Sequence, residues 1–455
     1  MSENLIIKEI EENQEEYIEF LRELIKSDSY NPPGNEKNVA VKIDKYLQEA
    51  GVKCEVFLFG GNRANLIAFL SDNFGEKNLL FNGHMDVVPP GDEKEWKYPP
   101  LSATVKRKKI IYGRGATDMK GALAAMSITL KILKKLNLEL SGNLIFNAVA
   151  DEETGGNLGT GWCLENVLKP RSIKCDFIII GEPSGINPLP KAIIIGEKGH
   201  LVIKVITNGK SAHSMAPFMG INAIYMMSKI IENFDRLDDF IPKVEPPFTL
   251  EELKSLITIS FPNEEIFNRI FNEQPLLQGL LKALTQFTKS LNMIKGGIKE
   301  NVIPDHCEAL IDFRLLPGQN SEVILNGLKK LINSIGFKIH EKSTTMPPEE
   351  GFVNLEIFHE GASSVWKDYN KSQTVKIFKE IADKVYGKTS YYMLAPGAND
   401  AYFYRNSGYC QETIHFGPGK AGQMHVVDEN IEIQDFIKAI KVYTLFAYHF
   451  LKKNK

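Results

Sequence analysis

Three short apolar segments of this chain each lead directly into acidic or imidazole side chains, and this repeated pattern constrains the fold more than any other feature. The pattern comprises residues 79–81 before His84 and Asp86, residues 144–150 before Asp151, Glu152 and Glu153, and residues 177–180 before Glu182. Short apolar runs of this kind are typical of buried strands. Ligands of open α/β sheets bind beyond the carboxyl ends of the strands, so we expect these polar side chains to meet at one edge.

Strands and helices alternate along the first part of the chain. Periodicity predicts helices at 15–26, 38–50 and 119–136, and strands at 65–70, 78–81, 143–150 and 176–180. Two further helices are expected at 374–386 and 430–452. This alternation indicates an α/β fold, in which helices cover the faces of a sheet.

A second unit begins near Gly196, where the first strand shows alternating polarity. Strands are predicted at 199–207, 311–315 and 337–341, and helices at 222–234 and 321–335. The order resembles a split βαβ, or ferredoxin-like, domain with an insertion at about residues 235–295. Pro347 and Pro348 are expected to mark the return to the first unit. The 455 residues are therefore expected to form two domains, residues 1–196 with 349–455 and residues 197–348.

The residue types at the three strand ends suit a divalent transition metal, because imidazole and carboxylate groups are ligands that zinc and similar ions prefer. Any single one of these motifs is more often a solvated loop, and Asp118, which precedes an Ala-rich helix, is more often a helix N-cap. That explanation weakens when three strands end alike, because carboxylates crowded without a cation raise one another's pKa and destabilise the fold. His84 and Asp86 point to the same face of an extended chain, which suits a histidine ligand held by a carboxylate.

Five stretches in a fixed order make the pattern more specific, namely GHMDVVPPGD, YGRGATDMKGALAAM, ADEETGG, GEPS and QMHVVDENI. Their order and spacing resemble the signature of the dinuclear zinc peptidase and deacylase family, which includes acetylornithine deacetylase, succinyl-diaminopimelate desuccinylase, aminoacylase and carboxypeptidase G. The resemblance extends along nearly the whole chain. It implies a zinc-peptidase-type α/β catalytic domain, with a central mixed sheet flanked by helices, and an inserted α+β ferredoxin-like domain that acts as lid and dimerisation domain.

The resemblance also implies two divalent metal ions, Zn or else Co or Mn. The implied roles are His84 and Glu182 on one ion, Glu153 and His425 on the other, Asp118 as the bridge, Glu152 as general base and Asp86 as the partner of His84. The family has a cis peptide bond after the bridging aspartate, here between Asp118 and Met119. In the implied mechanism the metals acidify a shared water, Glu152 takes its proton, and the resulting hydroxide attacks the amide carbonyl.

The predicted second domain carries family-like motifs of its own. GKSAHS resembles the lid motif whose histidine, here His213, reaches the neighbouring subunit and donates to the oxyanion, so a homodimer is expected. Asn301 and Arg314 would contact the substrate, and Arg314 suits a bidentate grip on a carboxylate. Without the resemblance, His213 is more simply an exposed loop residue and Arg314 part of a surface salt bridge. Gly397 would line the substrate site, in a Gly-Ala-Asn-Asp loop without the hydroxyl groups that the family often has there.

The expected function is metal-dependent cleavage of the amide bond of an N-acyl amino acid. A di- or tripeptidase or carboxypeptidase of the same family is the alternative, although Glu182, where some aminopeptidase members have aspartate, slightly favours a deacylase or carboxypeptidase-type substrate. A nucleotide-binding protein fits less well, because the glycine-rich residues 155–161 match neither common phosphate-binding motif and adjoin three acids. A catalytically dead relative fits less well too, since all five implied ligands and the base are present.

Charge and composition limit the partners. A net charge of -3 and a pI near 6.4 provide no basic surface for nucleic acid or an anionic membrane. No apolar run approaches the ~20 residues that span a bilayer, and the acidic N-terminus does not resemble a signal peptide. The five scattered cysteines favour reduced thiols and hence a cytoplasmic protein. The expected partners are a small N-acyl amino acid or short peptide and a second copy of the chain.

Overall fold

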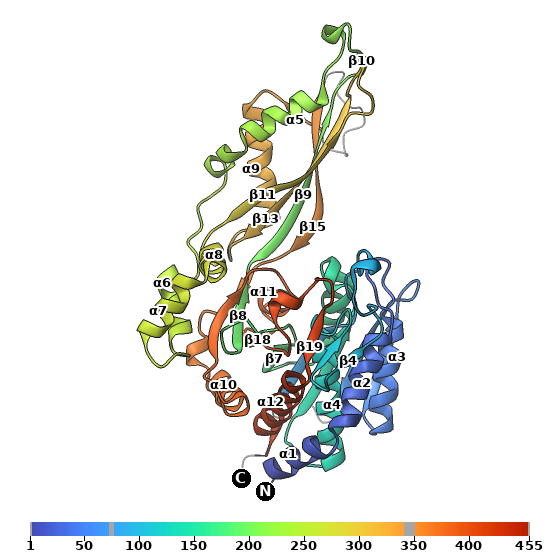
Figure 1. Cartoon of the computed structure of the whole chain (residues 1–455), viewed down its shortest axis with the longest axis vertical. Coiled ribbons are helices and arrows are strands. Elements are labelled where there is room, and N and C mark those ends of the chain that lie inside the picture. The colour runs from blue at the N-terminus through green and yellow to red at the C-terminus, as the bar shows by residue number, and fades with distance from the viewer. Residues whose placement is uncertain (1, 72–76, 341–350, 454–455) are drawn as a thin grey trace.

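The chain folds into two bodies that are stacked end to end (Figure 1). A computed structural model describes residues 2–71, 77–340 and 351–453. We call the body with the nine-stranded sheet the first domain and the body with the five-stranded sheet the second domain. Both chain termini lie at the end of the first domain that is farthest from the second domain (Figure 1).

The first domain is built on a mixed sheet in the order β1-β2-β6-β3-β7-β18-β8-β16, with β17 also paired to β8. Its strands are β1 (Lys53–Leu58), β2 (Ala64–Phe69), β3 (Asn78–His84), β6 (Asn143–Val149), β7 (Phe177–Ile180), β8 (Ala192–Glu197), β16 (Ser364–Val365), β17 (Tyr391–Ala395) and β18 (Thr413–His415). Strand β3 pairs in parallel with both β6 and β7, so the carboxyl ends of these three strands lie side by side. A separate small sheet consists of β4 (Thr104–Lys106), β5 (Ile110–Tyr112) and β19 (Asn430–Glu432).

Helices cover both faces of the large sheet, which confirms the predicted α/β fold with a central mixed sheet. One face packs on α1 (Ser2–Glu12), α2 (Gln14–Lys26), α3 (Lys37–Glu49), α4 (Lys120–Leu136), α10 (Gln373–Tyr386) and α12 (Ile433–Leu451). The other face packs on η4 (Leu164–Leu168) and α11 (Ala401–Asn406). Along β3, Leu79 and Phe81 belong to the first of these cores and Leu80 to the second. Burial on both faces explains why the consecutive residues 79–81 of this strand are all apolar.

The second domain contains a sheet in the order β11-β13-β9-β15-β14. Its elements are β9 (Gly199–Asn208), α5 (Ala223–Glu232), β11 (Thr288–Gly296), β13 (His306–Leu315), α9 (Ser321–Ser334), β14 (Lys338–Ile339) and β15 (Phe352–Gly361). Buried residues of β9, such as Leu201 and Ile203, alternate with half-buried ones, because α5 and α9 cover only one face. A short pair of strands, β10 (Ala212–His213) and β12 (Val302–Ile303), lies at the far tip (Figure 1). We call this pair, together with the residues that flank it, including Asn301, the arm.

The second domain extends further along the chain than predicted. Strand β15 pairs antiparallel with β9 from Phe352 to Gly361, whereas the strand predicted at 337–341 forms only the two-residue edge strand β14. The chain rejoins the sheet of the first domain at β16, so the predicted return at residue 349 is wrong. A proline pair cannot continue a sheet ladder and therefore suggested a crossover, but here it precedes another strand of the same sheet. Pro347 and Pro348 themselves lie outside the described residues.

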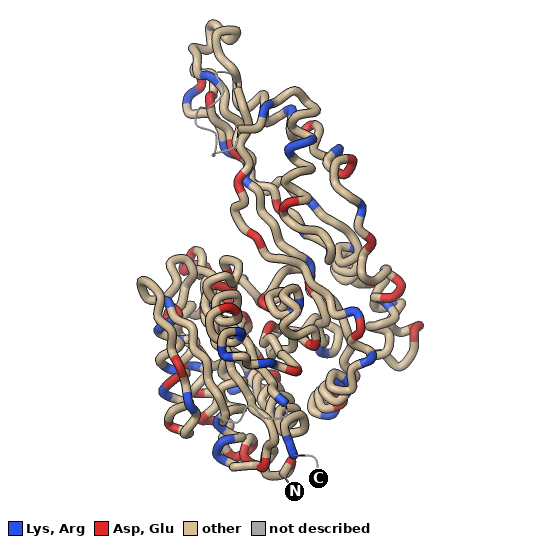
Figure 2. Tube along the Cα trace, turned by 180° about the vertical axis from the view of Figure 1, so that it is seen from behind, with Lys and Arg blue, Asp and Glu red and all other residues tan. Residues whose placement is uncertain are grey.

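The segment predicted as an insertion, residues 235–295, divides between the two domains. Helices α6 (Leu250–Thr258), α7 (Glu264–Glu273) and α8 (Pro275–Leu284) lie against the first domain, whereas η6 (Phe234–Asp239) and β11 belong to the second (Figure 1). Acidic and basic residues are interspersed over both domains (Figure 2). Among the described residues, no helix combines the length and apolar character needed to cross a membrane.

Candidate metal centre

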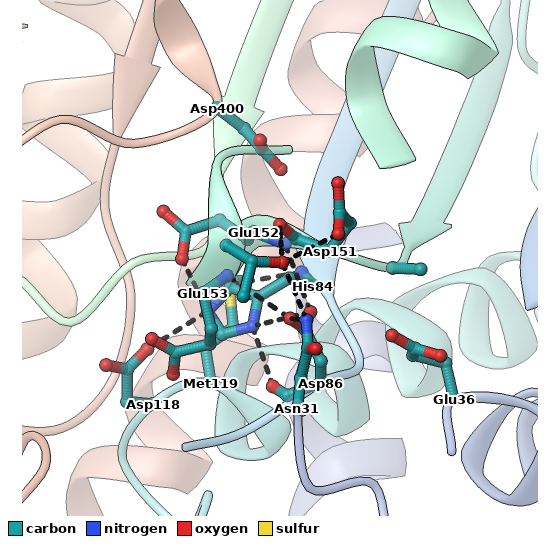
Figure 3. Close-up of polar contacts among 12 residues, drawn as sticks. Asn31, Glu36, His84, Asp86, Asp118, Met119, Asp151, Glu152, Glu153 and Asp400 are labelled. Atoms are coloured by element: carbon teal, nitrogen blue, oxygen red, sulfur yellow. Dashed lines mark hydrogen bonds and ion pairs between the residues drawn. The ribbon is translucent and has the colours of Figure 1, made fainter. Parts of the chain in front are cut away.

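The three strand ends that the sequence singled out meet at one edge of the large sheet. His84 is the last residue of β3, Glu152 begins the single turn η2 (Glu152–Thr154) after β6, and Glu182 follows β7. Asp118 reaches the same place from the loop before α4, and Figure 3 shows it close to His84 and Glu153. The parallel pairing of these strands is therefore what assembles the cluster.

Asp118 lies between two imidazole rings. Its Oδ1 is 3.0 Å from His84 Nε2, and its Oδ2 is 3.1 Å from His425 Nε2. His425 Nε2 is also 3.1 Å from Glu153 Oε2. On the other side, His84 Nε2 is 3.5 Å from Glu182 Oε1 and 3.9 Å from Glu152 Oε2. The two oxygens of Asp118 thus face two adjoining sets of nitrogen and oxygen ligands.

The cluster is chemically suited to cations. Two overlapping groups, His84 with Glu152 and Glu182, and His84 with Asp118 and Glu153, each place three ligand atoms within 4.8 Å of one another. Glu153 Oε1 is buried and has no hydrogen-bond partner, so one lone pair is free to bind a metal ion. Burial raises the pKa of Glu152 well above its usual range, and burial and Asp118 raise that of Glu153 to about 7. A divalent cation would remove the cost of keeping these carboxylates ionised.

Asp86 does more than hold His84. The closest atom of Asp86 to His84 Nδ1 is the backbone oxygen at 2.9 Å, while its Oδ1 is 3.6 Å away. Its carboxylate accepts hydrogen bonds from the backbone N–H groups of Glu152 and Glu153, each at 3.2 Å, and from Asn31 at 2.8 Å. Asp86 therefore links the end of β3 to the turn that carries both glutamates, which the sequence interpretation had not foreseen.

Glu429 is a second residue that the sequence interpretation missed. Its carboxylate accepts hydrogen bonds from the backbone N–H groups of Gly115, Thr117 and Asp118 at 2.8–3.1 Å and from Arg114 at 2.7 Å. These contacts hold the loop that presents Asp118, which also contains the expected cis peptide bond between Asp118 and Met119. The only signal in the sequence was the position of Glu429, four residues after His425 in the stretch QMHVVDENI.

Asp400 lies beside the centre and was quoted in the sequence only as part of a loop. It is buried and accepts hydrogen bonds from Thr160 at 2.8 Å and Asn82 at 3.2 Å. Burial raises its pKa to about 7, since the hydrogen bond from Thr160 offsets this effect only in part. Figure 3 shows its side chain near Glu152. Asp400 thus adds another carboxylate to the acidic side of the site.

A cavity of about 950 Å³ runs from these carboxylates to the open face of the second domain's sheet. Arg314 and Gly397, both predicted to bind substrate, line it from the second and the first domain respectively. Asp312 accepts hydrogen bonds from Arg314 Nε at 2.9 Å and faces His200 Nε2 at 2.7 Å. The cavity therefore has an acidic end and an end that carries an arginine and imidazole groups.

His213 and Asn301 do not lie with the other predicted site residues. Both belong to the arm at the tip of the second domain, where His213 pairs with Val302, and neither lines the cavity. Figure 1 shows the arm at the end of the molecule that points away from the first domain. Within one chain the structure thus assembles the predicted metal ligands, the base, Arg314 and Gly397, but leaves these two residues apart.

Comparison with known families decides the class of this site. Residues 80–449 match peptidase family M20/M25/M40. The chain belongs to this family. A probable succinyl-diaminopimelate desuccinylase of Staphylococcus aureus (strain N315) is 27% identical over 454 residues, which cover 97% of this chain and 99% of that protein. An N-formyl-4-amino-5-aminomethyl-2-methylpyrimidine deformylase of Halalkalibacterium halodurans is 24% identical over 463 residues, which cover 99% of this chain and 98% of that protein.

Solved structures of the M20/M25/M40 family have the same architecture. An M20 family metallo-carboxypeptidase, Sso-CP2 from Sulfolobus solfataricus, superposes with a TM-score of 0.75 at 25% identity, covering 95% of this chain and 98% of that one. The dipeptidase Dug1p from Saccharomyces cerevisiae gives a TM-score of 0.76 and covers 99% of both chains, although at 17% identity it shows the fold alone. The chain is accordingly a hydrolase of amide bonds that binds divalent metal, and its substrate is a small molecule.

Proposed function

We propose that this chain is a dinuclear metal-dependent deacylase that releases an amino acid from an N-acyl amino acid. The observation that carries this proposal is the placement of Asp118, whose two oxygens each face a different imidazole at 3.0–3.1 Å. One carboxylate shared between two adjoining ligand sets is what a two-metal site requires. His84 and Glu182 would hold one ion, and Glu153 and His425 the other. We propose zinc, with cobalt or manganese as alternatives, because the ligands combine imidazole and carboxylate.

The metal ions, when bound, supply Lewis acidity that polarises an amide carbonyl and acidifies water. The protein contributes Glu152, whose carboxylate lines the cavity next to His84. Glu152 would take a proton from water and then pass it to the leaving amine. Asp86 keeps the backbone of Glu152 and Glu153 in place through the two hydrogen bonds described above.

Arg314 would bind the carboxylate of the released amino acid. Asp312 holds the guanidinium through Nε, and Arg314 lies beside Gly397 of the first domain, where a side-chain carbon would be in ordinary van der Waals contact with Nη1 at 3.4 Å. The guanidinium therefore lies at the seam between the domains. Dipeptides and C-terminal peptide substrates carry the same carboxylate, and the relatives named dipeptidase and carboxypeptidase make a peptidase the second candidate.

We also propose that the enzyme works as a homodimer in which the arm of one subunit completes the site of the other. His213 is exposed, and Asn301 Oδ1, which is on the same arm, is buried without a hydrogen-bond partner. Three large apolar residues near His213 are more than 60% exposed, namely Met215, Phe218 and Met219. The loop at residues 214–220 contains no charged residue, and Figure 2 shows the outermost part of the tip in tan. An exposed, uncharged tip of this kind suits contact with a second protein chain.

Two measurements test the proposed function. The purified chain, dialysed against zinc and then freed of loose metal, should contain about two ions per chain, as in other two-metal hydrolases. The loaded enzyme is then assayed with N-acetylornithine, N-acetylmethionine and a dipeptide panel. Faster turnover of the N-acyl amino acids supports the deacylase, whereas turnover of dipeptides alone supports the peptidase. A chain without bound metal, or with metal but no activity on either panel, would contradict the proposal.

A further inference from the structure

Within the described residues, the chain passes between the two domains four times, whereas an inserted lid needs only two crossings. The crossings are at residue 198 and at residues 240–249, 285–287 and 362–363. The two middle crossings exist because helices α6–α8 lie between η6 and β11 in the sequence but are seated on the first domain (Figure 1). We call these three helices the strap.

The strap is part of the core of the first domain. Leu253, Ile257 and Leu281 are at most 1% exposed and belong to the same apolar cluster as Met393 on β17. Ahead of the strap, Phe248 packs edge-on against Tyr369 of the first domain, with the ring centres 6.4 Å apart. Separating the strap from the first domain would expose this apolar surface, so the strap is expected to stay attached during any movement between the domains.

Lys198 joins the first crossing to the third. Its side chain is buried, and Nζ donates hydrogen bonds to the backbone oxygens of Ala283 at 2.7 Å and Gln286 at 2.5 Å, at the C-terminal end of α8. Carbonyl groups at a helix C-terminus lack partners within the helix, and a lysine ammonium satisfies them while it balances the negative end of the helix dipole. Burial and the nearby Arg314 lower the pKa of Lys198 to about 8.

The neighbouring residue fixes the same crossing to the first domain. Glu197, the last residue of β8, forms a buried ion pair with Arg405 at 2.6 Å, and Ser364 at the fourth crossing hydrogen-bonds to both. The first crossing is therefore fixed to the first domain through Glu197, and Lys198, the next residue, connects it to the strap. Lys198 and Ala283 also line the cavity that contains Arg314 and the carboxylates.

We propose that Lys198 is a positioning residue, which fastens the strap to the crossing between the domains and thereby sets the distance from Arg314 to the metal-binding carboxylates. The proposal rests on the proposed function for its effect on catalysis, but not for the mechanical link itself. Replacing Lys198 removes the donors between the crossing and α8, so the sheet that carries Arg314 can shift relative to the first domain. Substrate binding through Arg314 then weakens, whereas the groups that perform the chemistry stay in place.

Hydrogen exchange tests the mechanical link. Lys198→Met keeps the length of the side chain and removes its donors, Lys198→Arg keeps donors, and Lys282→Met is a matched control because Lys282 is exposed on the same helix end. We expect backbone amides of α8 to exchange about tenfold faster in Lys198→Met, the effect of losing charge-assisted hydrogen bonds, with partial recovery in Lys198→Arg. No change should occur in Lys282→Met. Equal exchange in Lys198→Met and the wild type would overturn the proposal.

Kinetics test the consequence for the site. In Lys198→Met we expect KM for an N-acyl amino acid to rise about tenfold and kcat to change much less, since an interaction that positions substrate is lost. A fall in kcat at constant KM would overturn the proposed role. If Lys198→Met does not fold, hydrogen exchange in the wild type decides instead. Amides of α6–α8 that become exposed together with those of β8 support the link. Amides of α6–α8 that become exposed independently of β8 overturn the proposal. An enzyme with no amidase activity would refute the proposed function, while the exchange result would still decide whether the link exists.

Discussion

Two parts of the molecule carry residues that resemble catalytic motifs, and the positions of those residues are set in different ways. In the first domain, Glu152 and Glu182 follow strands that pair directly with β3, so hydrogen bonding between strands brings them to His84. In the second domain, His213 and Asn301 lie on the arm, and neither lines the cavity that holds the carboxylates. The relative positions of residues at neighbouring strand ends are set by the pairing of those strands. The position of a residue on the arm relative to a metal site depends instead on how the domains and subunits are arranged. Variants in the two regions should therefore behave differently, and four of them put this difference to the test.

The largest effect is expected at Glu152, in the region that the sheet assembles. Glu152→Gln keeps the shape of the side chain and removes its basicity, so turnover should fall by ~10²–10⁴-fold, as is typical when a general base is lost. Metal content should stay at the wild-type value, because the five proposed ligands are untouched. Glu165→Gln, an exposed glutamate on η4, is the control and should be fully active. If kcat of Glu152→Gln is close to that of the wild type, the roles of Glu152 and Glu153 are reversed or wrong.

The next largest effect is expected at His213, which tests whether the arm acts on another subunit. Loss of one oxyanion donor typically lowers kcat by ~10²–10³-fold, so His213→Ala should be nearly inactive while its metal content is normal. Mixed with Glu152→Ala after subunit exchange, it should regain part of the activity, because one site of the mixed dimer combines an intact Glu152 with an intact partner His213. Full inactivity of the mixture after confirmed exchange would show that His213 acts within its own chain or not at all. A monomer in solution would lead to the same conclusion.

The sequence predicted those features that repeat along it. The strands before His84, Glu152 and Glu182 were recognisable because each is short and consists mostly of apolar residues, and their shared edge follows from parallel pairing. The proposed bridging role of Asp118 was not contained in any local pattern, because an aspartate before a helix is usually an N-cap. It came only from the resemblance, and the structure places Asp118 between His84 and His425.

Other features depend on contacts between distant segments and could not be read from local patterns. Glu429 lies more than 300 residues after the loop that it holds, and the sequence shows it only as one acid among several. The true last strand of the second domain, β15, follows a proline pair that suggested a domain boundary. The strap consists of amphipathic helices, and their apolar faces reveal that they are covered but not by which domain.

A smaller effect is expected from Glu429→Gln. This variant tests whether metal affinity depends on the hydrogen bonds that hold the Asp118 loop as well as on the strands of the sheet. The amide keeps one oxygen acceptor but loses the charge that balances Arg114 and the second acceptor for the loop N–H groups. Partners that hold metal ligands typically contribute 10–100-fold to metal affinity, so zinc should bind about tenfold or more weakly in a competition titration. Glu432→Gln, which loses only an exposed contact to Lys420, is the control. Unchanged zinc affinity in Glu429→Gln would mean that the strands alone hold the site.

The smallest effect is expected at Arg314, the one predicted residue of the second domain that reaches the cavity of its own chain. Arg314→Lys keeps the charge but loses the fork that can grip a carboxylate at two points, and Asp312 would no longer hold the head group through Nε. We expect KM for an N-acyl amino acid to rise about tenfold while kcat changes little, because a charge-assisted hydrogen bond made equally in ground and transition states is removed. The matched test uses the same substrate with its carboxylate converted to an amide. The wild type should bind this amide more weakly than the carboxylate substrate, whereas Arg314→Lys should bind the two with similar affinity. If the amide discriminates against both enzymes equally, the carboxylate is recognised elsewhere. In that case none of the second-domain residues predicted to bind substrate would do so in its own chain, and the contrast with the residues that the sheet assembles would extend to Arg314.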